Sequence, residues 1–146
     1  MRKTLLAVIT MTIFTTGAAA LLASDKAAGK PQTTCPVSGK QIDKASYVDY
    51  QGQRVYFCCD NCPAKFKADP ETYFAKFAAE GVTLENIQTT CPVSGETLGE
   101  GDMGEPVAHA YKGRTVMFCC PSCIKKFDKE PAKYLAKLPG EQPAAS

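Results

Sequence analysis

The sequence predicts a small α+β protein made of two tandem modules, each a β-hairpin followed by two short helices. Two repeated motifs carry this prediction. The heptad Thr-Thr-Cys-Pro-Val-Ser-Gly occurs at residues 33–39 and again, unchanged, at residues 89–95. A second motif, Phe-Cys-Cys-x-x-Cys, occurs at residues 57–62 and 118–123. Because the same markers recur in the same order, they indicate a duplicated unit, and such a repeat outweighs local propensity.

The first twenty residues have the features of a secretory signal. Two basic residues follow the initial Met, an apolar run comes next, and small residues end it at Ala18-x-Ala20. We therefore expect residues 1–20 to be a cleaved signal peptide, with cleavage after residue 23 as the near alternative. An uncleaved anchor is the other interpretation, since residues 5–23 are just long enough to span a bilayer.

The charge balance excludes several classes of partner. The chain has 17 Lys and Arg against 15 Asp and Glu, and removal of the two basic residues of the signal makes these counts equal. A near-neutral mature chain has no basic block to neutralise phosphates. We therefore expect neither nucleic acid nor an anionic membrane surface as a partner. Because the apolar run is removed with the signal, we expect no stable membrane insertion after cleavage. The signal predicts a periplasmic or secreted location, and the polar residues 21–32 are predicted to be a flexible spacer.

The first module is predicted at residues 33–78. Its expected hairpin strands and helices are residues 46–50, 54–57, 62–68 and a second helix from residue 70 onward. Asp60 is the candidate N-cap of the first helix, and Asp69, followed by Pro, is the candidate N-cap of the second. Residues 79–88 form the predicted linker. Gly81 is expected to end the second helix, and the apolar residues of the linker are expected to pack between the modules.

The second module is predicted at residues 89–138, with residues 139–146 as a disordered tail. Its expected strands and helices are residues 107–111, 115–118, 123–129 and a helix from residue 131 onward. Ser122 is the candidate N-cap of its first helix. This module is longer than the first between its early Cys and its Cys pair, and residues 99–104 contain the insertion.

Eight cysteines are many for a chain of 146 residues. Each module is shorter than about 70 residues, and a core of that size rarely holds a fold without a metal ion or disulfides. In each module one early Cys precedes the hairpin, and three more follow it at a helix start. A turn, a hairpin and a helix that bring separated cysteines together are the construction of small treble-clef and zinc-ribbon modules.

Thiolate ligation of a metal ion is the interpretation that this spacing favours. The candidate ligands are the four cysteines of each module: Cys35, Cys58, Cys59 and Cys62, and then Cys91, Cys119, Cys120 and Cys123. A closed zinc site needs a Cys three residues after the early one, where Ser38 and Ser94 stand. The site is one sulfur short unless the extra Cys of the pair fills it. Three thiolates with an open position suit a soft ion such as Cu(I), or an exchangeable metal, better than a structural Zn²⁺.

Two other uses of the cysteines stay open. Two disulfides per module are the default in an exported protein, although a bridge between adjacent cysteines is strained. The second open use is thiol–disulfide redox chemistry. Each Cys-x-x-Cys lies at a helix start, where the helix field lowers a thiol pKa. A thioredoxin-like enzyme needs a βαβ context that these short modules lack, so we do not expect an enzyme. His109 aligns with Val48 and is not expected to be a ligand.

The ordered markers resemble the YHS domain, which overlaps the TRASH domain of metal sensing, trafficking and resistance. The markers are Cys-Pro-Val-Ser-Gly, then Tyr-x-Gly-x-x-Val-x-Phe-Cys-Cys-x-x-Cys-x-x-x-Phe, then Pro-x-x-Tyr, and they occur in both modules. The resemblance implies a treble-clef-like fold and metal binding without catalysis. It implies as ligands Cys35, Cys58 and Cys62, and Cys91, Cys119 and Cys123, with Cys59 and Cys120 as added cysteines. The gap between the first two cysteines of the second module exceeds the usual TRASH span.

These observations predict an exported heavy-metal-binding protein. Each module is expected to hold about one transition metal ion, Cu(I) or Zn(II), through Cys thiolates. The expected role is metal sequestration, trafficking or resistance, with a metal transporter or a metalloenzyme as the protein partner.

Overall fold

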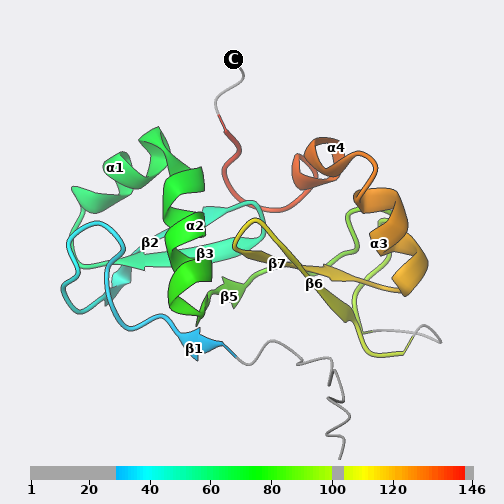
Figure 1. The fold of residues 1–146 in the computed structure, drawn as a ribbon, viewed down its shortest axis with the longest axis horizontal. Coiled ribbons are helices and arrows are strands. Elements are labelled where there is room, and N and C mark those ends of the chain that lie inside the picture. The colour runs from blue at the N-terminus through cyan, green and yellow to red at the C-terminus, as the bar shows by residue number, and fades with distance from the viewer. Residues whose placement is uncertain (1–28, 100–103, 144–146) are drawn as a thin grey trace, which may run out of the picture.

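The computed structural model describes residues 29–99 and 104–143. They form a small mixed fold of short strands and helices, arranged as two units side by side (Figure 1). The first unit contains β2 (Asp43–Tyr50), β3 (Gln53–Phe57), α1 (Cys62–Ala68) and α2 (Pro70–Glu80). The second contains β6 (Val107–Tyr111), β7 (Arg114–Phe118), α3 (Pro121–Phe127) and α4 (Pro131–Leu135). The predicted α+β architecture is confirmed, and the predicted signal, residues 1–20, lies outside the described residues.

Each hairpin turns over two residues with left-handed backbones. Gln51 and Gly52 have φ angles of 44° and 80°, and Lys112 and Gly113 have φ angles of 45° and 76°. Positive φ at both central positions is characteristic of the type I′ turn, whose twist matches that of antiparallel strands. Because this turn is so short, β3 and β7 each begin one residue earlier than predicted.

Helix α1 spans the predicted residues 62–68, whereas α3 starts two residues earlier than predicted, at Pro121. The predicted N-cap of α2 is confirmed, but those of α1 and α3 are wrong. Asp69 accepts a hydrogen bond from a backbone N–H of α2, and Gly81 ends α2 with a φ of 65°, as expected. Neither Asp60 nor Ser122 caps a helix; the N-cap positions are instead Asn61 and Cys120, without a side-chain cap bond. A Pro in the first turn of α1 and α3 removes one of the N–H groups that a cap satisfies. No helix within residues 29–99 and 104–143 is long and apolar enough to cross a bilayer.

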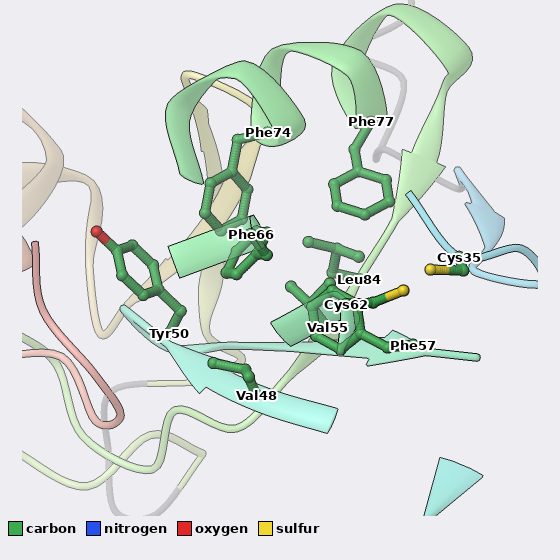
Figure 2. Close-up of a cluster of buried hydrophobic side chains, with 10 residues drawn as sticks. All are labelled: Cys35, Val48, Tyr50, Val55, Phe57, Cys62, Phe66, Phe74, Phe77 and Leu84. Carbon is green, nitrogen blue, oxygen red and sulfur yellow. The ribbon is translucent and has the colours of Figure 1, made fainter. Parts of the chain in front are cut away.

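Each unit has its own apolar core between its hairpin and its helices. In the first unit the ring of Phe66 lies at the centre (Figure 2), with its centroid 5.6–5.7 Å from the rings of Tyr50, Phe57, Tyr73 and Phe74. In the second unit Phe127 takes this place, next to the rings of His109, Tyr111, Phe118 and Tyr134. Burying one such ring stabilises the fold by about 1.5–3 kcal/mol. The helix that starts at the cysteines is therefore fixed to its hairpin by one central ring.

Segments predicted to lie between and before the modules contribute strands. β1 (Lys30–Pro31) pairs in parallel with β4 (Val82–Thr83), and β5 (Glu85–Asn86) pairs with β3. The predicted spacer, residues 21–32, therefore ends in a strand where it is described. The predicted linker, residues 79–88, contains two strands. Pairing with a strand edge satisfies backbone groups in a way that local sequence does not reveal.

The linker and the tail pack against the first unit. Leu84 is buried in the first unit's own core, and not between the units as expected. The prediction of a disordered tail at residues 139–146 does not hold for its described part. There the backbone N–H of Glu141 donates to the carbonyl of Asp49 at 2.7 Å. Both segments gain burial or hydrogen bonds from residues far away in the chain.

The two hairpin turns meet the opposite units in a reciprocal way (Figure 1). Gly52 of the first turn lies against the side chain of Leu138, beyond α4. Gly113 of the second turn lies against the backbone of Phe74 in α2, so closely that a Cβ atom would clash. Gly113 is therefore required both for its positive φ and for this approach.

Candidate metal centre

The first sulfur of each site comes from a tight turn. The backbone N–H of Cys35 donates to the carbonyl of Lys40 at 2.7 Å, and the N–H of Gly39 donates to the carbonyl of Cys35 at 2.8 Å. Gly39 has a φ of 71°, which favours glycine. The same two hydrogen bonds, both 2.8 Å long, close the turn between Cys91 and Glu96. The repeated heptad thus builds the same turn twice, with a Cys at its start.

The next two sulfurs come from the junction between hairpin and helix. Cys58 directly follows β3, and Cys62 is the first residue of α1. Figure 2 shows the sulfurs of Cys35 and Cys62 pointing toward each other at the edge of the core. Cys58 lies in the bend before α1 and Cys62 at its first residue, and both sulfurs lie within 4.8 Å of that of Cys35 in the early turn.

Three sulfurs converge in each unit. All sulfurs of a set lie within 4.8 Å of one another, and the sets are Cys35, Cys58 and Cys62, and Cys91, Cys119 and Cys123. Two sulfurs bound to one ion at about 2.3 Å are about 3.8 Å apart in a tetrahedron and about 4.0 Å apart in a trigonal plane. The sulfurs of Cys58 and Cys62 are 3.8 Å apart, and those of Cys119 and Cys123 are 3.6 Å apart. The donors, all free thiols, therefore fit one soft metal ion per set.

The thiols of a set differ in acidity. Burial is the largest influence on Cys35 and raises its pKa, but hydrogen bonds from Ser38 and nearby backbone groups outweigh burial and lower the pKa to about 6. The same balance lowers the pKa of Cys91 to about 7. Burial and the neighbouring thiols raise the pKa of Cys62 to about 12, and they also raise that of Cys123. Each set thus holds one ready thiolate and one thiol that must release its proton to a metal ion.

A serine hydroxyl stands where a fourth ligand would lie. Ser38 Oγ is 3.0 Å from Cys58 Sγ, and Ser94 Oγ is 3.3 Å from Cys119 Sγ. These are the positions at which a closed zinc site has its second Cys. Soft ions prefer thiolates to hydroxyl oxygens. The fourth side of each set therefore lacks a strong protein ligand.

The added cysteines lie on the outer side of the sets. Cys59 Sγ is 3.4 Å from Cys62 Sγ and 3.8 Å from Cys58 Sγ, yet it is not among the sulfurs that converge with Cys35. Cys120 has the matching position in the second unit, with the same two separations of 3.4 and 3.8 Å. Cys59 is exposed and Cys120 is half-buried.

Sequence reasoning missed two glutamines, one in each unit, that hold the early turn beside its hairpin. The amide of Gln32 bonds both backbone groups of Tyr56: its Nε2 donates to the carbonyl at 2.7 Å, and its Oε1 accepts from the N–H at 2.9 Å. Gln88 does the same to Met117, at 2.6 and 3.0 Å. The signal that could have found this pair is the Gln that precedes both heptads.

Comparison with known proteins points to the same chemistry. Residues 33–76, in the first unit, match the family model of the YHS domain. Over 90 residues the chain is 32% identical to a silver exporting P-type ATPase of Salmonella typhimurium. The aligned part covers 56% of this chain and 11% of that protein, so the chain spans a small fraction of that relative's length. No solved structure gives a significant match. The sulfur sets, the YHS match and this similarity together indicate metal binding.

Proposed function

We propose that this protein is an exported metal carrier that holds one soft ion, Cu(I) or Zn(II), in each unit. The observation that carries the proposal is the convergence of three Cys sulfurs within 4.8 Å, which occurs twice. The proposed ligands are Cys35, Cys58 and Cys62 in the first unit, and Cys91, Cys119 and Cys123 in the second. The metal ion is the cargo of this protein, and we propose no catalytic reaction.

The donor set favours an ion that can be exchanged. A closed four-ligand site is typical of structural zinc, whereas a site with an open position admits another ligand. In both units the fourth Cys lies outside the three converging sulfurs, and a serine hydroxyl lies within 3.0–3.3 Å of one of the three thiols. This arrangement supports sequestration or delivery of the ion over a purely structural role.

The similarity to a silver exporting ATPase supports a soft cargo, because thiolates select soft ions. We propose that a metal transporter or a metalloenzyme receives the ion. The signal predicted at residues 1–20 supports a periplasmic or secreted location, where such a carrier would collect metal outside the cytoplasm.

Native mass spectrometry of the reduced chain tests the proposal. We expect about two Cu(I) or Zn(II) ions per chain, with proton release on binding. Cys62→Ser and Cys123→Ser should each lower the count by one, and the double variant should bind none. Ser122→Ala, beside Cys123 but outside the sulfur set, is the matched control and should still bind two. Four disulfides without metal uptake would contradict the proposal, and an unchanged count in the Cys variants would contradict the ligand assignment.

Thiol–disulfide exchange is a second candidate function, which a contrast within each Cys-x-x-Cys favours. Hydrogen bonding with Cys62 lowers the pKa of the exposed Cys59, whereas burial raises the pKa of Cys62 to about 12. An exposed thiol with a lowered pKa, 3.4 Å from a buried thiol, resembles an attacking and a resolving cysteine. Insulin reduction well above the rate of a free dithiol, lost in Cys59→Ser, would support this function. A rate equal to that of the free dithiol would remove it.

A further inference from the structure

We infer that Cys59 and Cys120 are transfer ligands, through which the metal ion passes between an outside thiol and the inner sulfur set. The inference rests on the proposed function and adds to it a route into and out of the site. Its basis is the arrangement of four sulfurs in each unit, which forms two overlapping sets of three.

In the first unit the two sets share one edge. The inner set consists of Cys35, Cys58 and Cys62. The outer set replaces Cys35 by Cys59, and its three sulfur separations are 3.4, 3.8 and 3.8 Å. These values are close to the roughly 3.8 Å expected for thiolates on one tetrahedral ion. Either set can therefore surround an ion, while the sulfurs of Cys58 and Cys62 belong to both.

The second unit repeats this arrangement. The outer set there consists of Cys119, Cys120 and Cys123, with sulfur separations of 3.8, 3.4 and 3.6 Å. The two residues between the cysteines of the Cys-x-x-Cys differ completely, Asp-Asn in the first unit and Pro-Ser in the second. The four-sulfur arrangement therefore depends on the positions of the cysteines and not on one local sequence.

Exposure distinguishes the inner set from the outer set. Cys35, which belongs to the inner set alone, is 1% exposed, whereas Cys59, which belongs to the outer set alone, is an exposed residue. In the second unit Cys91 is 1% exposed and Cys120 is half-buried. A thiol of a donor or acceptor molecule can therefore approach the outer set, while the early Cys at the turn is closed to it. The added Cys is the first protein sulfur that an arriving ion can meet.

Movement from the outer to the inner set needs a single ligand exchange. A metal–sulfur bond to Cys35 forms while the metal–sulfur bond to Cys59 breaks, and the bonds to Cys58 and Cys62 persist. Each bonding electron pair comes from a sulfur or returns to it, so the oxidation state of the metal does not change. A proton displaced from the incoming thiol goes to the departing thiolate or to water. Release follows the same steps in reverse.

The test uses the full chain in the Cys123→Ser background, in which the second unit is expected to lack its site. Cu(I) is supplied as its glutathione complex, and its transfer is followed by stopped flow, with release measured into a chromophoric Cu(I) chelator. We expect Cys59→Ser to slow loading and release about tenfold or more. The equilibrium affinity should change by less than about threefold. Cys35→Ser keeps the outer set, so it should still bind one ion, with fast exchange and weaker affinity.

The alternatives give different results. If Cys59→Ser weakens equilibrium binding as strongly as Cys35→Ser, Cys59 is a fourth ligand and the inference fails. Loading and release at the parent rate would overturn it as well. Failure of the parent background to bind any Cu(I) or Zn(II) would overturn the proposed function itself. Cys120→Ser in the Cys62→Ser background repeats the test in the second unit, and the same kinetic effect is expected there.

Discussion

The two units present nearly the same sulfur geometry on cores of different composition. The first core has four buried phenylalanines and Tyr50. The second has two buried phenylalanines, and Leu135 and Leu138 stand where the first unit has Phe74 and Phe77. The sulfur separations in the two units differ by no more than 0.2 Å for the pairs Cys58–Cys62 and Cys119–Cys123. The site therefore depends on the turn, the strand end and the helix start, which the repeat preserves, and tolerates change in the core behind them.

The units also differ in what each contributes to the other. The residue after the turn glycine is buried in both hairpins and reaches across: Gln53 Nε2 donates to the carbonyl of Thr115 at 2.8 Å. Its counterpart Arg114 stacks on the ring of Phe74, 3.9 Å from its centroid, and forms an ion pair with Glu71. A neutral amide thus enters one unit, and a buried guanidinium enters the other. The first unit depends on the second through a charged group that is costly to leave without its partners.

Removing the central ring of a core is expected to have the largest effect. Phe66→Ala and Phe127→Ala should each lower the free energy of unfolding by about 3–5 kcal/mol, because each leaves a cavity among several rings. Since each turn packs on the opposite unit, we expect one cooperative transition in both variants, measured by chemical denaturation with circular dichroism. Tyr47→Ala, at an exposed ring of β2, is the control. Two separate transitions in the parent protein would show that the units fold independently.

Arg114→Ala tests the asymmetry between the units. It should cost about 2–4 kcal/mol, from the lost cation–π contact and charge-assisted hydrogen bonds. Gln53→Ala, the matched change in the other turn, should cost about 1 kcal/mol, because it removes a neutral hydrogen bond. Both costs would be measured by chemical denaturation of the metal-free protein. Equal costs would contradict the view that Arg114 is the stronger link.

The hairpins and helices could be predicted from the sequence because their signals are local. Alternating strand residues, a Gly in each turn, and Asp69 followed by Pro predicted elements that the structure contains. The segments around the modules were predicted less well. Leu84 and Glu141 are held by a core and a strand formed from residues far away in the chain. Such long-range contacts leave no periodic pattern in the local sequence.

The sulfur sites could be predicted further than their surroundings. The spacing of Cys35, Cys58 and Cys62 indicated candidate ligands, and the structure brings these three sulfurs together. The side of the set on which Cys59 lies could not be predicted, because it depends on the direction of side chains at the helix start. The two hydrogen bonds between the Gln32 amide and the backbone of Tyr56 were missed for a similar reason, because a single Gln forms no sequence pattern that would reveal its partner strand.

Adding the missing sulfur should close the metal site in both units. Ser38→Cys places a fourth thiol next to Cys58, where the hydroxyl lies at 3.0 Å, and Ser94→Cys does so where the separation is 3.3 Å. We expect Zn(II) affinity to rise about tenfold or more with each change, because four thiolates complete a tetrahedral site. Zn(II) release to a chelator should slow in parallel. Ser38→Ala and Ser94→Ala are the controls, and a Cys variant that binds Zn(II) no better than its Ala control would contradict the proposed position of the fourth ligand.

The smallest effect is expected from His109→Val, which gives the second unit the residue that the first unit has at Val48. His109 is paired across the hairpin with Val116, as Val48 is with Val55. Its Nε2 lies 3.1 Å from Asp128 Oδ1, an exposed pair that adds little to stability. The free energy of unfolding should therefore change by less than about 1 kcal/mol. The metal count should stay at two by native mass spectrometry, whereas a fall to one would mean that the second unit uses an imidazole ligand and that its site differs in kind from the first.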